Sequence, residues 1–256
     1  MARPSIFITG AAAGIGRATA KLFVAEGWLV GAYDVDRQGL DSLTQEVGAS
    51  NLVTGVLDVR DVAAWEREAM VFFAAAGSRL DVLLNNAGIL YSGPFENITP
   101  EQHHRLVDVN IKGVINGCHA ALPYLRRTPN SRVINMASAG AIYGHPSLAS
   151  YSASKFAVRA LTEALDLEWD KYGVKVRDVW PLYVSTAMVD NLQARSVKTI
   201  GVTLTAEDVA QTILRMTRDA GGKVHWPVGW RTHVLASSVK LLPDRINRLL
   251  TRWTST

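Results

Sequence analysis

The stretch 5–16 reads SIFITGAAAGIG, and the prediction of the fold starts from it. Its first half is short, apolar and β-rich, which is typical of a buried parallel strand. Glycines follow with the spacing G-x-x-x-G-x-G, and apolar residues then recur at helical intervals. Glycines in a strand-to-helix turn let the backbone approach a pyrophosphate, whose charge the helix N-terminus favours. We therefore expect a dinucleotide to be held by Gly10, Ala13, Gly14, Ile15 and Gly16.

The rest of the chain alternates predicted strands and helices. Further strands are predicted at 28–33, 51–57, 80–84, 132–136, 174–179 and 223–226, and helices at 17–26, 40–47, 62–76, 100–125, 151–172 and 206–218. Thr99, Pro100 and Gln102 form a start signal for the helix at 100–125. The alternation predicts an α/β fold, with a single Rossmann-type, doubly wound parallel sheet of about seven strands and helices on both faces. We expect one domain over 1–256, with a variable basic tail at about 227–256.

The composition is that of a globular chain, since 48% of the 256 residues are hydrophobic and 20% are charged. The single cysteine, Cys118, excludes an internal disulfide and a cysteine metal cluster. The histidines show no ligand spacing, so no metal site is expected. Neither a secretion signal nor a transmembrane segment is predicted, and we expect a cytoplasmic protein.

The net charge of +4 is unevenly distributed. Residues 223–256 hold six basic residues and one acidic residue, which gives +5 there and −1 for the remainder. Basic residues mixed with leucine and tryptophan are typical of a membrane-surface or acidic-partner contact, or of a solvated helix face beside an oligomer interface. Because the charges are scattered, the sequence favours the solvated face. Without a concentrated basic face, nucleic-acid binding is not expected.

Asp34 closes the second predicted strand and bears on the choice of cofactor. A carboxylate at this place accepts both hydroxyls of the adenosine ribose and repels a 2′-phosphate. NAD(H) is therefore favoured, and NADP(H) is not excluded. Arg17 and Arg37 are the opposing candidates for a phosphate contact. After the third strand, Asp58 and Val59 are expected at the adenine edge, with a helix N-cap as the alternative role for Asp58.

Tyr151 and Lys155 stand four residues apart at the start of a predicted helix, so their side chains share one face. A nearby ammonium favours the phenolate, and we expect Lys155 to lower the pKa of Tyr151. Ser138 closes a predicted strand and places a hydroxyl opposite this phenol. Such tyrosine–lysine pairs are also common on helix surfaces. The glycine loop and Asp34 favour an active site instead.

These motifs together resemble the short-chain dehydrogenase/reductase family. The resemblance covers about residues 5–188 and rests on the glycine loop, the NNAG at 85–88, Asn110, Ser138 and the Y-x-x-x-K pair. It implies hydride transfer between a nicotinamide cofactor and an alcohol or ketone. The implied catalytic residues are Asn110, Ser138, Tyr151 and Lys155, and further cofactor contacts are Asn86, Ala87, Gly88, Tyr151, Lys155, Pro181, Val184 and Thr186. A homotetramer or homodimer built on the helices of Asn110 and Tyr151 is also implied, and the apolar outward face at 156–169 is compatible with it.

The resemblance assigns a role to each catalytic residue. Tyr151 accepts the proton of an alcohol or donates it to a ketone, and Ser138 hydrogen-bonds the substrate oxygen. Lys155 is expected to reach the nicotinamide ribose, and Asn110 to hold a water that links Lys155 to solvent. Leu182 departs from the family, which has glycine there, and adds bulk near the nicotinamide. The alternative functions are a non-catalytic dinucleotide-binding regulator on the same fold and, less in keeping with the chain length, an epimerase or dehydratase.

Substrate contacts are expected after the fifth and sixth strands. The candidates are Ser138, Tyr143, His145, Tyr151, Leu182, Tyr183 and Met188. Their largely apolar and aromatic character favours a hydrophobic secondary alcohol or its ketone. His145 precedes Pro146, and an exposed loop residue is the alternative interpretation. The segment 182–201 lacks a period and is expected to act as a lid.

Overall fold

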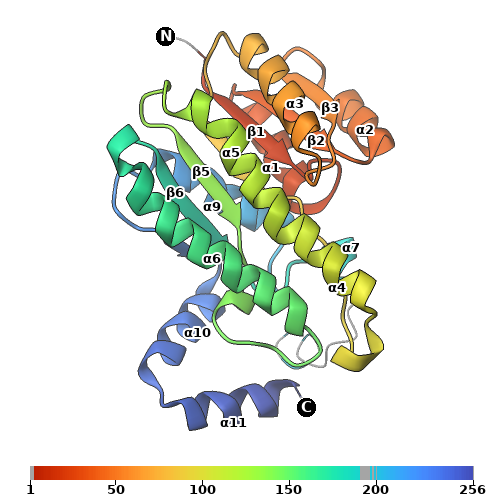
Figure 1. Cartoon of the computed structure of the whole chain (residues 1–256), viewed down its shortest axis with the longest axis vertical. Coiled ribbons are helices and arrows are strands. Elements are labelled where there is room, and N and C mark those ends of the chain that lie inside the picture. The colour runs from red at the N-terminus through yellow and green to blue at the C-terminus, as the bar shows by residue number, and fades with distance from the viewer. Residues whose placement is uncertain (1–2, 191–196, 198, 200, 256) are drawn as a thin grey trace.

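The computed structural model describes residues 3–190, 197, 199 and 201–255. These residues form a parallel sheet of seven strands in the order β3-β2-β1-β4-β5-β6-β7 (Figure 1). The strands are β1 (Ser5–Thr9), β2 (Leu29–Asp34), β3 (Leu52–Val56), β4 (Val82–Asn85), β5 (Arg132–Met136), β6 (Lys175–Trp180) and β7 (His225–Pro227). The strand order reverses between β1 and β4, and ligands of such sheets bind there, beyond the carboxyl ends of the strands. The predicted α/β fold is confirmed.

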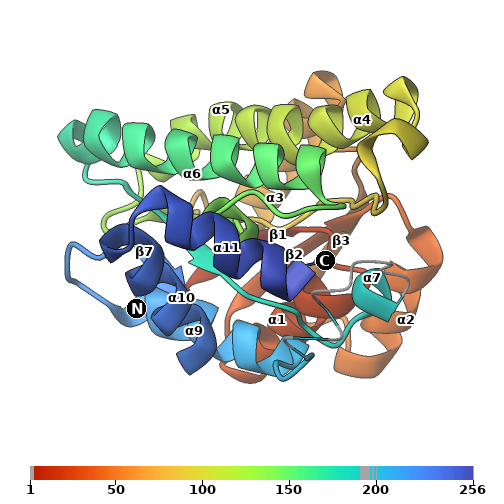
Figure 2. The ribbon, with the colours of Figure 1, turned by 90° about the horizontal axis from the view of Figure 1, so that it is seen from below.

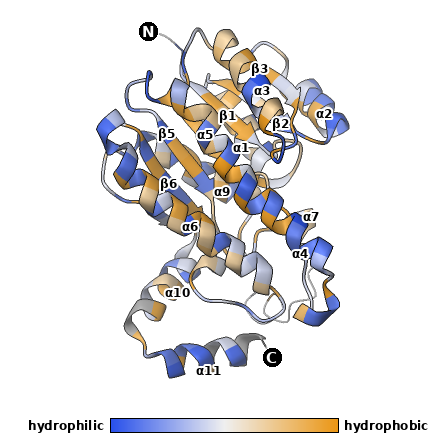
Figure 3. Cartoon of the chain, in the orientation of Figure 1, coloured by the Kyte–Doolittle hydropathy of each residue, from blue (hydrophilic) through white to orange (hydrophobic). Residues whose placement is uncertain are grey.

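Helices cover both faces of the sheet, which Figure 2 shows between the two layers. One layer contains α3 (Val62–Ala75), α5 (Gly113–Leu125) and α6 (Ala149–Trp169), and the other contains α1 (Gly14–Ala25), α2 (Arg37–Val47) and α9 (Ala206–Arg218). Successive residues of a strand point to opposite faces. Phe7 of β1 therefore joins the core that contains Phe72 of α3, whereas Ile6 and Ile8 join the core that contains Phe23 of α1. The sheet is correspondingly apolar in Figure 3.

The helix predicted at 100–125 is one continuous helical run with a local irregularity. It consists of α4 (Pro100–Val107), a π-helical turn η2 (Asp108–Lys112) and α5. Thr99 and Gln102 form the predicted capping box at its start. The π turn contains Asn110, and π turns within helices are frequent at functional sites. The expectation of an uninterrupted α-helix is therefore corrected over η2.

Other elements begin at residues that differ from the prediction, because local capping and strand pairing set their boundaries. Helix α2 begins at Arg37 because the side chain of Asp36 accepts a hydrogen bond from the Gly39 N–H and caps it. Strand β7 begins at His225 rather than at residue 223, because its pairing with β6 starts at His225. The outward apolar face of α6 is also smaller than expected, since Trp169 is buried while Leu167 is 81% exposed.

The C-terminal tail is helical and consists of α10 (Trp230–Leu241) and α11 (Asp244–Ser255), which lies apart from the sheet in Figure 1. Of the expected lid, the structure describes a short helix, α7 (Ala187–Asp190), while 191–196, 198 and 200 lie outside the described residues. Within the described ranges, no helix has the length and apolarity needed to span a membrane.

Candidate active site

A cavity of about 430 Å³ opens at the carboxyl ends of the strands. Most of the predicted site residues line it: Gly10, Ala13, Gly14, Ile15, Asp34, Asp58, Val59, Asn86, Ala87, Gly88, Ser138, His145, Tyr151, Lys155, Pro181, Leu182, Tyr183, Val184, Thr186 and Met188. Gly16, Asn110 and Tyr143 are not among its lining residues. The fold thus brings the predicted cofactor and substrate groups to one continuous space.

The glycine loop joins β1 to α1 in a backbone conformation that needs glycine. Gly10 has a φ of +67°, and a Cβ there would lie 2.9 Å from the Cα of Ala87. A Cβ at Gly16 would collide with the carbonyl oxygen of Gly10. Gly16 therefore acts below the loop rather than on the cavity wall. The loop forms part of the cavity wall where α1 begins. A pyrophosphate in the cavity could therefore approach the N-terminus of this helix.

Asn86 and Thr9 fasten this loop to the end of β4. The amide of Asn86 donates to the carbonyl oxygens of Thr9 at 2.9 Å and Gly10 at 3.0 Å. In return, Thr9 Oγ1 accepts the backbone N–H groups of Asn86 and Ala87, each at 3.1 Å. The NNAG segment thus holds the glycine loop in register with the rest of the cavity wall.

Asp34 lies at the cavity wall where β2 ends. Its two carboxylate oxygens accept the backbone N–H groups of Ala12 at 3.0 Å and Asp36 at 3.1 Å. Arg17 points away into α2, since its guanidinium donates to the Gly39 carbonyl at 3.0 Å and pairs with Glu46 at 2.8 Å. Neither Arg17 nor Arg37 is among the lining residues. Asp34 therefore presents a carboxylate to the cavity, and neither of the two arginines weighed against NAD(H) lines the wall beside it.

Asp58 lines the same end, and its carboxylate is already engaged. The guanidinium of Arg60 pairs with it at 2.5 Å and holds the pKa of Asp58 below its usual value. The alternative role of Asp58 as a helix N-cap is wrong, because Asp61 caps α3 by accepting the Ala64 N–H at 3.1 Å. Val59 also lines the wall, and its carbonyl oxygen accepts the ring N–H of Trp65 at 3.0 Å.

Lys155 is buried on α6 and has a neutral partner. Its ammonium donates to the carbonyl oxygen of Met136 at 2.7 Å, and the residue is 4% exposed. No ion pair of Lys155 with a carboxylate occurs in the part of the chain that the structure describes. Burial consequently lowers the pKa of Lys155 from 10.5 to about 8. Among the buried groups of the cavity wall, this cation is poorly compensated.

Tyr151 lines the cavity one helical turn before Lys155. The Lys155 Nζ lies 5.5 Å from the centre of the Tyr151 ring. Burial raises the pKa of the Tyr151 phenol, and a hydrogen bond with Ser138 offsets only part of this effect. The expected lowering of this pKa is therefore wrong, because desolvation of the phenolate is the largest cause and the net shift is upward. The phenol is held in its protonated form.

Ser138 sits at the carboxyl end of β5, where the short 3₁₀ helix η3 (Ala139–Ala141) begins. Its Oγ accepts the Gly140 N–H at 3.1 Å, which fixes the hydroxyl on the cavity wall. The Ala139 N–H donates to the Pro181 carbonyl oxygen at 2.9 Å and so ties β5 to the segment after β6. The hydroxyl of Ser138 and the phenol of Tyr151 thus meet at one point of the wall, as predicted from the sequence.

Asn110 lies behind the wall and is 1% exposed. Its side chain makes a reciprocal pair of bonds with Ile89, accepting its N–H at 2.8 Å and donating to its carbonyl at 2.9 Å. A further bond of 3.2 Å runs to Ser154 Oγ on α6. The side-chain amide is therefore occupied in joining η2, α6 and the loop after β4. Asn110 lies near Lys155, as expected, because the side chains of both residues approach Gly88.

The segment after β6 forms the opposite wall of the cavity. Leu182 lines it and also packs against the buried core, and its φ is not positive. The leucine thus replaces the family's glycine without left-handed backbone strain. The carbonyl of Val184 accepts the Thr186 hydroxyl at 3.3 Å, and Val184 bridges to Leu204. These contacts place the predicted nicotinamide-side residues against the cavity.

On the substrate side the structure separates the predicted residues. His145, Tyr183 and Met188 line the cavity, whereas Tyr143 does not. The interpretation of His145 as an exposed loop residue is wrong, since its Nδ1 is buried without a partner and burial lowers its pKa. Arg105 of α4 also lines the wall and was missed, because no sequence signal indicates that α4 runs beside the cavity.

The chain matches the family model of short chain dehydrogenases over residues 4–196. It is 34% identical over 225 residues to a 3-oxoacyl-(acyl-carrier-protein) reductase of Thermotoga maritima, covering 85% of this chain and 91% of that protein. It is 35% identical to a 3-ketodihydrosphingosine reductase of Bacteroides thetaiotaomicron, covering 82% and 73%. A 3-ketoacyl-(acyl-carrier-protein) reductase structure from Brucella melitensis with NADH aligns with a TM-score of 0.81 and 26% identity, covering 90% and 98%. The chain belongs to the short-chain dehydrogenase/reductase family of oxidoreductases.

Proposed function

We propose that the protein is an NAD(H)-dependent oxidoreductase that interconverts a hydrophobic secondary alcohol and its ketone. One observation carries the proposal: Ser138, Tyr151 and Lys155 line the same cavity as the glycine loop. The shared lining supports the proposal, because a proton donor and a hydroxyl would be near a dinucleotide bound at that loop. When bound, the nicotinamide supplies or accepts the hydride.

Tyr151 is the proposed general acid and base. The raised pKa keeps its phenol protonated, which is the form that donates a proton to the oxygen of a ketone during reduction. In the reverse direction the same oxygen takes up the alcohol proton as the phenolate, after its own proton has passed to solvent. Ser138, whose hydroxyl is fixed by the Gly140 N–H, hydrogen-bonds the reacting oxygen and stabilises the charge that develops on it.

Lys155 and Asn110 are the proposed supports of this proton transfer. An ammonium with a pKa of about 8 exchanges a proton near neutral pH, and one neutral oxygen holds it in the folded chain. It therefore retains donors for the ribose hydroxyls of the cofactor. Because the Asn110 side chain is occupied by Ile89 and Ser154, its contribution to a relay is proposed to come from its backbone in the π turn.

The preference for NAD(H) rests on Asp34, because similar proteins hold either NADH or NADP. The carboxylate is fixed at the wall by two backbone N–H groups, and Arg17 is tied to Glu46. Asp34→Ala combined with Val35→Arg should weaken NADH binding about tenfold and strengthen NADPH binding. Titration of both cofactors by fluorescence measures this shift, and the Val35→Ala variant is the control. An unchanged ratio of the two dissociation constants contradicts the preference.

The substrate class is inferred from the cavity wall. Leu90, Leu148, Leu182 and Met188 contribute apolar surface there, and the charged lining groups are Asp34, Asp58, Arg60, Arg105 and Lys155. Such a lining suits a ketone on a hydrophobic skeleton. The proposed experiment is a screen of NAD⁺ reduction with hydrophobic secondary alcohols and of NADH oxidation with the matching ketones. NADH binding without turnover of any compound would favour the alternative, a dinucleotide-binding regulator.

A homodimer or homotetramer is part of the proposal. Exposed apolar side chains on α5 and α6 support it, with Ile115 47% exposed, Phe156 39% exposed and Leu167 81% exposed. Apolar surface of this kind on two adjacent helices is typical of a helix-packing interface. Light scattering measures the mass directly, and a monomer mass contradicts this part of the proposal.

A further inference from the structure

The helices α10 and α11 form an arm beyond the carboxyl edge of the sheet, which we call the C-terminal arm (residues 230–255). Helix α10 contacts β7 and η3, the short helix that follows Ser138. Asn247 of α11 joins the two helices, because its amide donates to the carbonyl oxygens of Val239 at 3.2 Å and Leu242 at 3.1 Å. Figure 1 shows α11 apart from the sheet and its covering helices.

The arm exposes large apolar side chains. On α11, Ile246 is 41% exposed and Leu249 is 64% exposed, and on α10, Trp230 is 72% exposed and Val234 is 58% exposed. Ile246 and Leu249 lie three residues apart and so share a face of the helix. The buried Asn247 lies on a different face, toward α10. The apolar stripe of α11 is therefore directed away from the protein, where it is unfavourable in water.

Basic residues accompany this stripe. Arg245, Arg248 and Arg252 are spaced by three and four residues, which aligns them along α11 beside Leu249. The arm holds five basic residues and one acidic residue, a net +4. Subtracting these from the 27 basic and 23 acidic residues of the whole chain leaves 22 of each, so the remainder is neutral. A second copy of the chain therefore offers no opposite net charge to the arm.

We propose that the C-terminal arm docks on a lipid surface that carries anionic headgroups. An amphipathic helix with arginines beside an apolar stripe lies in the plane of such a surface. Leu249 and Ile246 enter the boundary of the acyl chains, while the arginine stems run along it and their guanidinium groups reach the phosphates. The proposal is independent of the catalytic assignment, since none of these residues lines the cavity.

The position of the arm gives this docking a consequence. Helix α10 rests on η3, the segment immediately after Ser138, and both lie at the carboxyl end of the sheet. A lipid surface bound by the arm would then lie at the end of the molecule where the cavity opens. A hydrophobic compound dissolved in that surface would be close to the cavity.

Sedimentation of the full-length chain with lipid vesicles tests the proposal. One set of vesicles is made of phosphatidylcholine, and the other contains phosphatidylglycerol as well. The protein should sediment only with the second set, and binding should fall as salt is raised. Arg248→Glu should weaken binding by at least about fivefold, since each basic residue near an anionic surface contributes about a factor of five. Leu249→Asp should weaken it similarly, by placing a charge in the apolar stripe.

Matched variants elsewhere keep the test specific. Met70→Asp changes a side chain on α3 that is 60% exposed, and Arg126→Glu reverses a charge at the exposed end of α5. Both should bind vesicles like the wild type, and the thermal unfolding midpoint of each variant shows that it is folded. Two results overturn the proposal: no sedimentation with either vesicle, or equal sedimentation of wild type and arm variants. A change of mass by light scattering in Leu249→Asp, without vesicle binding by the wild type, would instead identify the arm as an interface between copies.

Discussion

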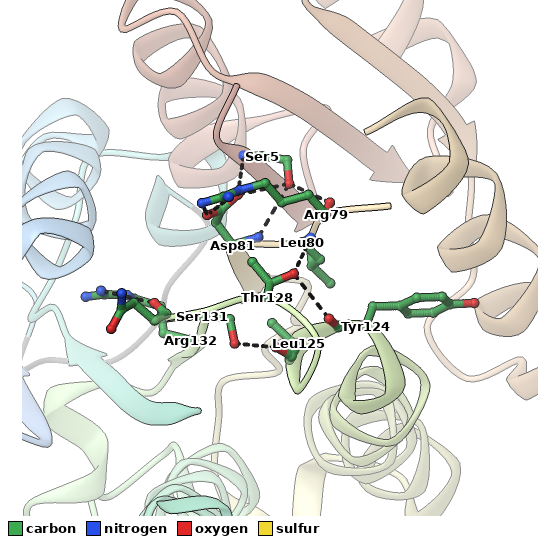
Figure 4. Close-up of polar contacts among 10 residues, drawn as sticks. Ser5, Arg79, Leu80, Asp81, Tyr124, Leu125, Thr128, Ser131 and Arg132 are labelled. Carbon is green, nitrogen blue, oxygen red and sulfur yellow. Dashed lines mark hydrogen bonds and ion pairs between the residues drawn. The ribbon is translucent and has the colours of Figure 1, made fainter. Parts of the chain in front are cut away.

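The two edges of the sheet surround their buried charges in different ways. At the edge where the strands begin, the Asp81 carboxylate accepts the Ser5 N–H at 2.9 Å. It also accepts N–H groups from Nε and Nη2 of the Arg79 guanidinium (Figure 4). Beside it, Thr128 Oγ1 accepts the Leu80 N–H at 3.1 Å and donates onward to a carbonyl. Each charged or polar group there has a partner suited to it.

Two buried arginines extend the same pattern. Arg132 and Arg177 both donate to the Met216 carbonyl near the end of α9. Arg177, of which the side chain is 2% exposed, also pairs with the Asp219 carboxylate at 3.0 Å. Arg177 thus has a carboxylate partner, whereas Arg132 has only carbonyl acceptors among the described residues, and burial together with the neighbouring Arg177 lowers its pKa. This edge stabilises the fold.

At the opposite edge, three ionisable groups are under-compensated, whereas Asp34 and Asp58 have partners. The Lys155 ammonium has the Met136 carbonyl, the Tyr151 phenol is held protonated by burial, and His145 Nδ1 is buried without a partner. Such groups are costly in the folded chain and are available to a ligand. The comparison indicates that one edge mainly stabilises the fold and the other carries the proposed chemistry. Substitutions at the first edge should therefore change the free energy of unfolding, and substitutions at the second should change turnover.

The largest combined effect on turnover and stability is expected from Lys155→Met. Turnover should fall by about a thousandfold, because the proposed support of Tyr151 is lost. The free energy of unfolding should rise by about 1 to 3 kcal/mol, because a poorly compensated buried cation is removed. Initial rates and urea unfolding measure the two quantities. Lys171→Met, an exposed lysine, should change neither. A destabilised Lys155→Met variant would contradict the comparison.

Asp81→Ala should have the reverse profile at the other edge. Removing the carboxylate leaves the Ser5 N–H and the Arg79 guanidinium without their acceptor. The free energy of unfolding should fall by about 2 kcal/mol, while kcat/KM in the folded variant stays unchanged. Asp81→Asn retains an acceptor and should lose less. Loss of turnover without loss of stability would show that the two edges are not separate in function.

A smaller effect is expected from pH. The pKa of Lys155 is about 8 in the folded chain against 10.5 for the ordinary group. Below the lower value both states bind the proton, and the folded state bears the full cost of the buried cation. Between the two values the unfolded chain binds more protons, so stability rises with pH. From about pH 7 to about pH 9 the wild type should gain about 1 kcal/mol relative to Lys155→Met, as measured by urea unfolding. Parallel pH profiles would contradict the assignment.

Much of this arrangement can be predicted from the sequence, because it is local. The strand-loop-helix start at 5–16, the pairing of Tyr151 with Lys155 and the acid at Asp34 depend on spacing along the chain, and the fold brings them together as expected. Parallel strands that end in polar residues deliver those residues to one edge. Once the alternation of elements is identified, the gross position of the cavity follows.

The parts that could not be predicted depend on contacts between distant segments. The π turn at η2 accompanies the bonds of Asn110 to Ile89 and Ser154, which no local pattern shows. The direction of the Tyr151 pKa shift depends on burial by the surrounding elements rather than on the neighbouring lysine. Arg105 likewise reaches the cavity through the placement of α4.

The central claim is that Tyr151 transfers a proton to or from the substrate oxygen in the cavity at the carboxyl ends of the strands. Tyr151→Phe removes one oxygen atom and keeps the ring, so the measurement is steady-state turnover of a compound found in the screen, together with NADH binding. Turnover should fall by about a thousandfold or more while NADH affinity changes by less than about threefold. Tyr143→Phe, a loop tyrosine outside the cavity lining, should behave as the wild type. Turnover of Tyr151→Phe close to that of the wild type would contradict the account.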